Sequence, residues 1–374
     1  MTDQKEHYEH KLYKHCDEKE ADAVAWAFVN KEKMVKFPFK FPPIAPNEVR
    51  ANILYAGLCH SDVMTVREHW GPAMFPIAPG HEIIGEVSLV GSDVKDFKKG
   101  DLVAFGTVRD SCGKCRYCKK DREELCRDVE EHYTYGFHWG GYATALQQPA
   151  SHFFHLPPKF DIAKGAPLLC AGITTYYPMK KFLKPGMVTA VIGIGGLGHI
   201  AVKFLKKLGH DVTAFTTSPN KVDMIKKELG ADHVVISTDE KQMKEVADKF
   251  DFIINTLPTR DGLEKYINTL CGEGIFAQVG MPPVNACTFQ LDAFTMVVKE
   301  AIFVGSNVGP NWCINEMLPL CAEKDIYPIV EEFSFEDFPK AFDKLENGRP
   351  HFRCVVNVKN WAEKHGFKKY KKCF

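Results

Sequence analysis

Four cysteines fall close together in one stretch of the chain, in a pattern that suits a tetrahedral metal ion. A structural zinc takes four such thiolates, and closely spaced ligands lose little chain entropy when the ion binds. An iron–sulfur cluster shares the Cys-x-x-Cys-x-x-Cys spacing, but no Pro follows the last cysteine and no second cluster run is present. We therefore predict a structural zinc on Cys112, Cys115, Cys118 and Cys126.

A glycine-rich segment at residues 193–198 has the pattern Gly-x-Gly-x-x-Gly. It directly follows an apolar run at 187–193 that predicts a buried strand, and it leads into a helical pattern at 197–208. In that setting, glycines let the backbone turn tightly and approach a pyrophosphate at the helix N-terminus. A plain strand-to-helix turn is the alternative. The predicted dinucleotide site comprises Gly193, Ile194, Gly195, Gly196, Leu197 and Gly198.

The end of the next predicted strand, at residues 211–216, indicates which dinucleotide binds. An NAD enzyme places Asp or Glu about 20 residues after the glycines to hold the ribose 2′-hydroxyl. This chain has no carboxylate there, and its hydroxyl groups and lysine suit a 2′-phosphate, which predicts NADP(H). The residues are Thr216, Thr217, Ser218 and Lys221. They also suit a helix N-cap followed by a solvated lysine, and the two interpretations are compatible.

The composition is typical of a soluble globular protein. Of 374 residues, 45% are hydrophobic and 26% charged, and 48 Lys and Arg balance 48 Asp and Glu, so we expect no nucleic-acid partner. A polar N-terminus and the lack of an apolar run of about 18 residues predict neither a signal peptide nor a membrane partner. The 13 cysteines, an odd number, argue against a disulfide framework and for a reducing, cytoplasmic location.

Two kinds of domain must position these residues. From residue 25 to about 165, short β-runs such as 49–55, 83–90 and 101–105 alternate with Gly- and Pro-rich turns, which predicts a barrel-like antiparallel domain. Between 166 and 327, strands alternate with helices, which predicts a doubly wound parallel sheet of the Rossmann type. Its expected strands are 187–193, 211–216, 234–237, 250–256, 274–280 and 301–307, with helices at 197–208 and 220–229. Residues 328–374 return to the first domain, and 1–24 form a polar leader.

Three further residues of metal-ligand type, Cys59, His81 and Cys170, are dispersed along the chain. Taken singly, each is more often a packed residue than a ligand. Their flanking sequences change this assessment: Gly-Leu-Cys-His-Ser-Asp at 57–62, Pro-Gly-His-Glu at 79–82 and Leu-Leu-Cys-Ala-Gly at 168–172. With the cysteine run, the glycine loop and Thr-Thr-Ser-x-x-Lys at 216–221, they make the chain resemble the zinc-dependent medium-chain dehydrogenases from about residue 25 to 358. The resemblance is closest to the cinnamyl-alcohol-dehydrogenase-like branch.

The resemblance implies a GroES-like catalytic domain, a Rossmann domain and a catalytic zinc held by Cys59, His81 and Cys170, with Glu82 as an occasional or alternate ligand. It also implies that Ser61 hands the proton to the substrate oxygen. Contacts to the nicotinamide cofactor are further implied for Thr174, Thr256, Gly280, Ser306, Asn307 and Val308.

The chain departs from the family pattern at Met64, where many relatives carry a histidine that continues the proton path. The path must then use the cofactor ribose and solvent, or another group such as His69.

The expected activity is the reversible oxidation of alcohols and reduction of aldehydes with NADP(H) and two zinc ions per chain. We expect a broad range of aldehyde substrates, or hydrophobic and aromatic ones, because four aromatic side chains could line the pocket. For each of these side chains, simple packing in the core or on the surface is the alternative. These are Trp70, Phe75, Trp139 and Trp312. Two other functions fit the fold: an NADPH-dependent reductase of activated C=C bonds, and a zinc protein without turnover. We expect a homodimer through residues 294–306, partly by analogy with the family.

Overall fold

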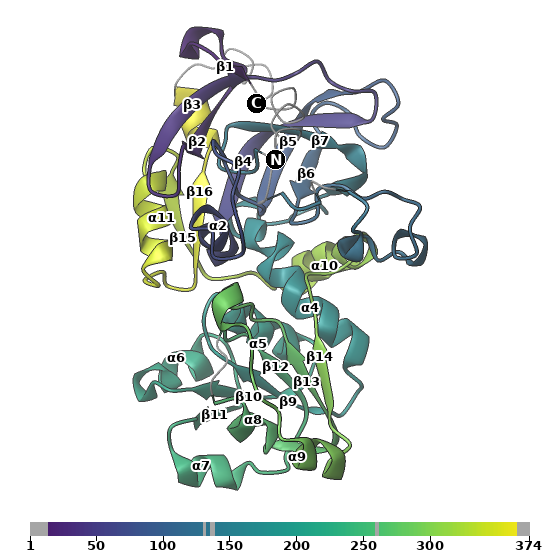
Figure 1. The fold of residues 1–374 in the computed structure, drawn as a ribbon, viewed down its shortest axis with the longest axis vertical. Helices are drawn as coiled ribbons and strands as arrows, with labels where there is room; N and C mark the ends of the chain where they lie inside the picture. The colour runs from purple at the N-terminus through teal and green to yellow at the C-terminus, as the bar shows by residue number, and fades with distance from the viewer. Residues whose placement is uncertain (1–13, 130–131, 135–138, 259–261, 365–374) are drawn as a thin grey trace. The chain divides into compact units, whose positions relative to one another are not determined.

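The computed structural model describes residues 14–129, 132–134, 139–258 and 262–364. The chain forms two compact units (Figure 1). Unit 1 comprises the residues up to Pro157, the segment Asp161–Leu169 and the residues from Val330 onward. Unit 2 comprises Pro158–Phe160 and Cys170–Ile329, so the chain returns to unit 1 after completing unit 2.

Unit 1 is built on a seven-stranded sheet with the order β15-β16-β4-β5-β6-β8, in which β7 also pairs with β4. All its pairs are antiparallel except β15 with β16. A smaller antiparallel sheet has the order β1-β3-β2. The strands are β1 Lys14–His15, β2 Ala23–Phe28, β3 Met34–Lys40, β4 Glu48–Leu58, β5 Ile83–Val90, β6 Leu102–Phe105, β7 Ala145–Pro149, β8 Phe153–His155, β15 Val330–Ser334 and β16 Arg353–Asn357.

The longer helices of unit 1 pack on this β-rich core. They are α2 His60–Val66, α3 Ile162–Gly165, α11 Phe338–Glu346 and α12 Lys359–Lys364. Helix α11 buries Phe338, Ala341, Phe342 and Leu345, a spacing that places all four on one face. Its last turn is held to α2 by an ion pair between Glu346 Oε1 and Arg67 Nε at 2.5 Å.

Unit 2 contains a six-stranded sheet in the order β11-β10-β9-β12-β13-β14, and every pair is parallel. Its strands are β9 Val188–Ile192, β10 Asp211–Thr216, β11 His233–Ile236, β12 Phe250–Asn255, β13 Leu270–Gln278 and β14 Ile302–Gly305. Its helices are α4 Ala171–Phe182, α5 Gly198–Lys207, α6 Val222–Lys227, α7 Glu240–Glu245, α8 Glu264–Ile267, α9 Ala293–Val298 and α10 Asn311–Lys324. Strand β9 lies between β10 and β12, so the glycine loop that follows it stands where the strand order reverses.

This architecture confirms the predicted fold class, with two differences in detail. Residues 14–24 of the expected polar leader are in part structured, because β1 pairs with β3 and the apolar strand β2 already begins at Ala23. Residues 1–13 lie outside the described part of the chain. The helix expected at 220–229 begins as a 3-10 turn, Pro219–Lys221, before α6, because a proline suits a first turn.

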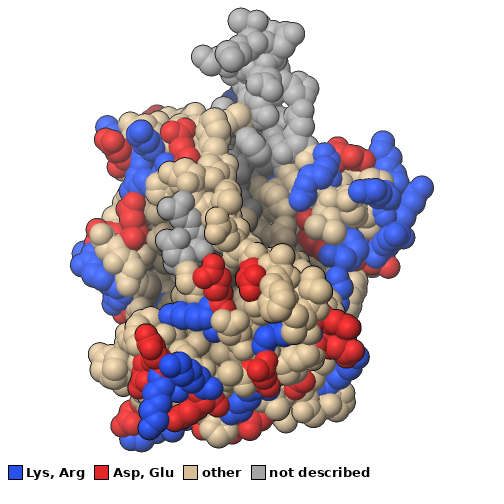
Figure 2. Space-filling view, turned by 60° about the horizontal axis from the view of Figure 1, so that its bottom comes forward, with Lys and Arg blue, Asp and Glu red and all other residues tan. Residues whose placement is uncertain are grey.

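Two further properties concern the length of the helices and the charge of the surface. Among the described helices, none has the length and apolar character needed to span a bilayer. Positively and negatively charged side chains are interspersed over much of the face shown in Figure 2, in keeping with the equal numbers of acidic and basic residues.

Candidate active site

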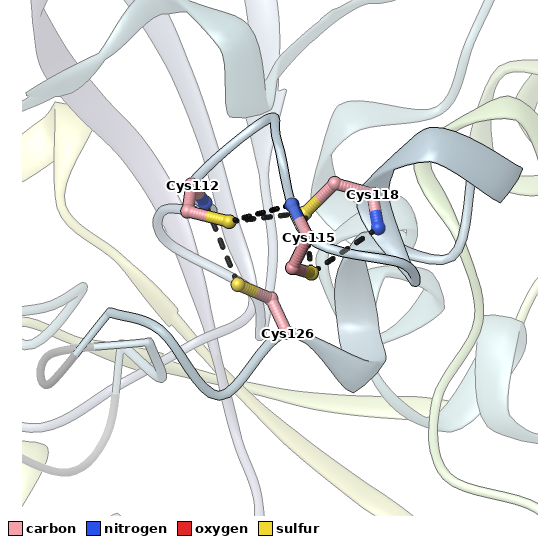
Figure 3. A group of neighbouring side chains, drawn as sticks. All are labelled: Cys112, Cys115, Cys118 and Cys126. Atoms are coloured by element: carbon pink, nitrogen blue, oxygen red, sulfur yellow. Dashed lines mark hydrogen bonds between the residues drawn. The ribbon is translucent and has the colours of Figure 1, made fainter.

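The four clustered cysteines converge in one loop of unit 1 (Figure 3). Their sulfur atoms all lie within 4.8 Å of one another, a spacing that suits a common metal ion. Backbone N–H groups support them: the amides of Cys115 and Cys112 donate to the sulfurs of Cys112 and Cys126, at 3.3 and 3.4 Å. Such donors stabilise thiolates, and the backbone N–H of Cys118 lowers the pKa of Cys115 to about 7. Four thiol groups around one point fit a structural zinc and no disulfide joins any cysteine in the described ranges.

A second group of ligand-type side chains consists of Cys59, His81, Glu82 and Cys170, all of them buried. One ligand atom from each lies within 4.8 Å of the others. Cys59 is the residue between β4 and α2, and His81 and Glu82 directly precede β5. Cys170 follows the 3-10 turn Ala166–Leu169 and precedes α4. The structure thus brings together the four dispersed residues that the resemblance named.

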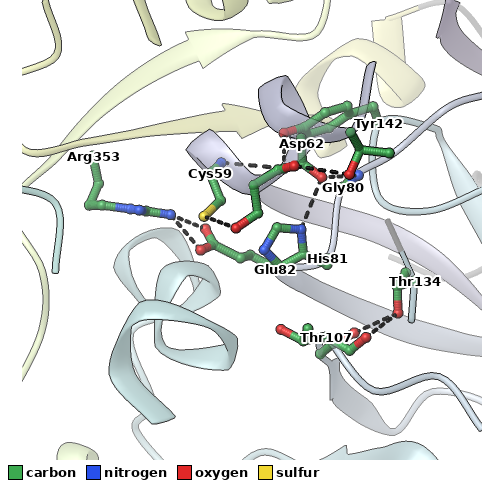
Figure 4. A network of polar contacts seen from close by, with 12 residues as sticks. Cys59, Asp62, Gly80, His81, Glu82, Thr107, Thr134, Tyr142 and Arg353 are labelled. Carbon is green, nitrogen blue, oxygen red and sulfur yellow. Dashed lines mark hydrogen bonds and ion pairs between the residues drawn. The ribbon is translucent and has the colours of Figure 1, made fainter. Parts of the chain in front are cut away.

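His81 is oriented by Asp62, whose Oδ1 lies 2.9 Å from Nδ1 of the imidazole (Figure 4). The same carboxylate accepts from the Tyr142 hydroxyl at 2.6 Å and from the Gly80 amide at 2.9 Å. Because Nδ1 faces Asp62, Nε2 is the nitrogen left for a metal ion. Burial alone would lower the pKa of His81, but the Asp62 carboxylate and Cys59 raise it well above the usual value.

Glu82 is held from its other side by Arg353, and this buried ion pair is also visible in Figure 4. Nη2 of Arg353 lies 2.6 Å from Oε2 of Glu82. Burial raises the pKa of Glu82 to about 7, against the opposing effect of the Arg353 charge. A Cβ at position 57 would stand 2.1 Å from Oε2 of Glu82, so any larger residue there would displace this carboxylate. Arg353 on one side and the close approach of Gly57 on the other therefore hold the Glu82 carboxylate beside Cys59, His81 and Cys170.

Three residues to which the sequence analysis gave no role complete this site: Asp62, Tyr142 and Arg353. The sequence held a signal for Arg353, since this cation directly precedes an apolar run, Cys354 to Val356. Its partner could not be read from the sequence, because 271 positions separate Arg353 from Glu82.

Ser61 and Met64 both lie on helix α2, which begins beside the Cys59 thiol. The Ser61 hydroxyl oxygen is 3.5 Å from the Cys59 sulfur, and its side chain is half-buried. Met64 is buried, and its thioether sulfur lies 3.3 Å from Nδ1 of the exposed His69. A thioether carries no proton, so this contact offers no direct continuation from Ser61 to His69.

The glycine loop of unit 2 is closely packed at both ends. Gly193 has a φ of +83°, which favours glycine. At position 198 a Cβ would stand 1.8 Å from the Gly193 carbonyl oxygen, so a side chain there would block the turn. The Thr256 hydroxyl lies 2.7 Å from that same carbonyl. The loop then opens helix α5, whose N-terminus is the expected place for a pyrophosphate.

The residues expected to choose the dinucleotide lie at the end of β10. The hydroxyl of Thr216 is largely buried and accepts a hydrogen bond from the Ser218 amide at 3.1 Å, whereas Thr217 and Lys221 are exposed. The structure places the remaining expected cofactor residues in unit 2 as well: Thr174 in α4, Ile194 to Leu197 in the glycine loop, Gly280 after β13, and Ser306, Asn307 and Val308 after β14.

The aromatic residues suggested for a pocket wall differ in their surroundings. Trp139 packs in the core of unit 1 against Phe37 and Phe39, with ring centroids 4.6 and 5.0 Å apart, so plain packing accounts for it. Phe75 also packs on that core. Trp312, on α10 of unit 2, remains 41% exposed, and its ring lies edge-on to Tyr177 with centroids 6.4 Å apart.

Comparison with known proteins agrees with these features. A model of the alcohol dehydrogenase GroES-like domain matches residues 45–158, and a model described as zinc-binding dehydrogenase matches residues 196–323. An aldehyde reductase, AdhA of Synechocystis, is 37% identical over 86% of this chain and 94% of its own length. The chain therefore belongs to the zinc-dependent medium-chain alcohol dehydrogenase family.

Two solved structures extend the likeness to the whole fold. A cinnamyl alcohol dehydrogenase of Sorghum bicolor, SbCAD4, has a TM-score of 0.84 and 32% identity, covering 90% of this chain and 97% of that one. The CAD of Helicobacter pylori, solved in complex with NADP(H), has a TM-score of 0.82 and 32% identity, covering 90% of this chain and 98% of that one. The family resemblance drawn from the sequence is thus confirmed.

Proposed function

We propose that this protein is an NADP(H)-dependent alcohol dehydrogenase that reduces aldehydes and oxidises the corresponding alcohols. Its substrates would be a broad range of aldehydes, or hydrophobic and aromatic ones. The observation that carries the proposal is the buried set of Cys59, His81 and Cys170. Two thiols and one imidazole are the ligands of a catalytic zinc that keeps a fourth position open. The proposal is supported by the names of the relatives, an aldehyde reductase and a cinnamyl alcohol dehydrogenase.

The chain's own residues then have distinct tasks. Cys59, His81 and Cys170 would hold the zinc, which when bound supplies Lewis-acid stabilisation of a carbonyl or alkoxide oxygen. Asp62 fixes the ring orientation of His81, and Ser61 would donate a proton to the substrate oxygen or take one from it. The glycine loop would bind the pyrophosphate, and hydride transfer itself belongs to the nicotinamide.

The direct test is oxidation of NADPH in the presence of benzaldehyde or cinnamaldehyde, followed with and without a zinc chelator. Turnover that is lost with the chelator and restored by added zinc supports the proposal. Turnover of an activated C=C bond that survives the chelator would favour the second function named above. No turnover of any of these compounds would favour a zinc protein without activity.

We expect the purified protein to contain about two zinc ions per chain, and Cys112→Ser to reduce this to about one. The structural ion contributes its binding energy to folding, so this variant should also melt at a lower temperature. The readouts are metal analysis and thermal unfolding. Cys287→Ser is a matched control, because Cys287 is exposed and lies outside both ligand groups. If Cys112→Ser keeps two zinc ions and melts like the wild type, the structural site is assigned to the wrong residues.

NADPH should be preferred over NADH by about tenfold or more, which corresponds to the about 1.5–3 kcal/mol of a hydrogen bond to a charged group. Lys221→Ala should raise the Michaelis constant for NADPH and leave the value for NADH nearly unchanged. Lys226→Ala is the control, because Lys226 is also exposed but lies one turn further along α6. Equal use of both cofactors by the wild type would contradict this interpretation of residues 216–221.

We further propose a homodimer in a reducing, cytoplasmic compartment. Support for the dimer comes from the sheet edge at β14 and from the exposed apolar side chains of α9 and β14: Phe294, Val297, Val298 and Ile302. Such an edge invites pairing with a second copy. No disulfide joins the described cysteines, in keeping with a reducing compartment.

Light scattering should therefore show a dimer at micromolar concentration, and Val297→Asp should shift it to the monomer. The new charge would be buried without a partner at the interface. Leu208→Asp changes an exposed leucine of unit 2 outside this surface and should leave the dimer intact. A wild-type monomer would refute the proposed assembly.

A further inference from the structure

Helix α5 contacts a second segment of unit 2 besides the glycine loop at its own N-terminus. This segment, residues 326–329, follows α10 and ends unit 2, since Val330 begins both β15 and the return to unit 1. Ile326 and Tyr327 are buried. The main chain of the segment makes two hydrogen bonds to side chains of α5, one turn apart on the helix.

His199 makes the first of these bonds and is fully buried. Its Nδ1 lies 2.9 Å from the carbonyl oxygen of Gly195, and its Nε2 lies 3.2 Å from the amide nitrogen of Ile329. A carbonyl only accepts and an amide N–H only donates, so the ring is the neutral tautomer that donates from Nδ1 and accepts at Nε2. One imidazole therefore bridges the middle of the glycine loop and the last residue of unit 2.

Lys203 makes the second bond, from Nζ to the carbonyl oxygen of Tyr327 at 2.8 Å. The ring of Tyr327 in turn packs edge-on against Phe160, with centroids 5.5 Å apart. Phe160 belongs to Pro158–Phe160, a short stretch of unit 2 that stands in the sequence between two stretches of unit 1. Helix α5 thus anchors the segment 326–329 directly, and Tyr327 links this segment to Phe160.

We propose that His199 and Lys203 form a clamp through which a dinucleotide bound at the glycine loop fixes the segment that leads back into unit 1. The proposal rests on the proposed function only in taking this loop as the dinucleotide site. The Gly195 carbonyl accepts hydrogen bonds from both the backbone amide and the ring of His199. A shift of this carbonyl when the dinucleotide binds would therefore move the imidazole, and with it the amide of Ile329. Coupling of this kind is reciprocal: holding Ile329 favours the loop conformation that binds the dinucleotide.

His199 acts through the backbone of two other residues and is therefore a positioning residue. Two substitutions separate its contacts. In His199→Asn, the amide nitrogen replaces Nδ1 and keeps the bond to Gly195 but loses Ile329. In His199→Gln, the longer side chain places its oxygen near the position of Nε2 and keeps the bond to Ile329 but loses Gly195.

The experiment measures hydrogen–deuterium exchange of the segment 326–330 in the full-length protein, free and with NADPH, together with the Kd for NADPH from its fluorescence. In the wild type, NADPH should slow exchange of this segment. In His199→Asn, exchange of the free protein should be about threefold to tenfold faster, the loss expected for one hydrogen bond. NADPH should no longer slow it. In His199→Gln, exchange of the free protein should remain near the wild-type rate, while the Kd for NADPH rises.

Lys203→Met provides a second variant that does not alter the buried ring, and it should also speed exchange at 326–330. Lys206→Met is its matched control, because Lys206 also lies on α5 but pairs with Asp232 and not with the segment 326–329. Equal exchange rates in the wild type, His199→Asn and Lys203→Met would overturn the clamp. A wild type that binds no NADPH would contradict the proposed cofactor instead, and the exchange rates of the free proteins would still decide whether the clamp exists.

Discussion

Aldehyde reduction is expected to fall by several orders of magnitude in Cys170→Ala, while the protein stays folded. The substitution removes one of two thiols from the buried group and leaves Cys59 and His81. Lewis-acid stabilisation of the substrate oxygen is worth several kcal/mol, and each about 1.4 kcal/mol changes the rate tenfold. The four-cysteine lobe is untouched, so its contribution to folding remains.

The measurements are kcat with cinnamaldehyde and NADPH, the zinc content and the melting temperature. We expect about one zinc per chain in this variant. Cys321→Ala is the matched control, because Cys321 is a buried cysteine on α10 that lies in neither ligand group, and it should keep its activity and both ions. Unchanged turnover in Cys170→Ala would exclude zinc-assisted hydride transfer and would move the assignment to the reductase of activated C=C bonds.

Ser61→Ala should lower turnover by about a hundredfold to ten-thousandfold, the range typical of general acid–base assistance. Its hydroxyl lies 3.5 Å from the sulfur of Cys59, one of the residues that would hold the catalytic zinc. The alanine keeps all the ligands, so the zinc content should stay at about two. Ser61→Thr retains a hydroxyl and should recover most of the rate.

The neighbouring Met64 makes the serine test more informative. Because the Met64 thioether that contacts the His69 imidazole carries no proton, this contact cannot pass a proton on from Ser61 to His69. A Ser61→Ala variant that keeps both zinc ions and turns over within about threefold of the wild type would therefore assign the proton to solvent or to the cofactor.

The centre of the parallel sheet of unit 2 could be predicted closely from the sequence, because strands β9, β10 and β12 consist almost wholly of buried residues. Strand β10 occupies the predicted residues 211–216, and β9, β11 and β12 differ from the prediction by one residue at one or both ends. Such strands are continuous apolar runs bounded by turns, and the helices between them end at glycines. Strand β5 of unit 1 also matches, at residues 83–90.

Helix α11 was not predicted, although its apolar residues have helical spacing. It spans only nine residues and lies between two short strands, a length at which periodicity does not separate helix from strand. Trp139 shows a different kind of limit. The sequence could not tell a pocket wall from a core residue, because that depends on the rings of β3 that contact it.

The two metal groups were predictable to different degrees for a physical reason. The four-cysteine lobe has local spacing, so its convergence follows from the chain itself. The catalytic group combines residues 59, 81, 82 and 170, and only the family resemblance linked them before the fold was known. The partners that orient them, Asp62 and Arg353, depend on strand pairing, which spacing does not encode.

The division of unit 1 has a consequence for how the protein is made on the ribosome. Strand β4 is synthesised early, but its neighbour β16 is among the last segments to emerge, after the whole of unit 2. Until then the nascent chain presents an unpaired edge of β4, and Glu82 has no Arg353 to neutralise it. Unit 2 can fold first, whereas the carboxylate of Glu82 in the buried ligand group gains its counter-charge only once the C-terminal segment is released. A chain that stops before residue 353 would lack both the strand and the counter-charge.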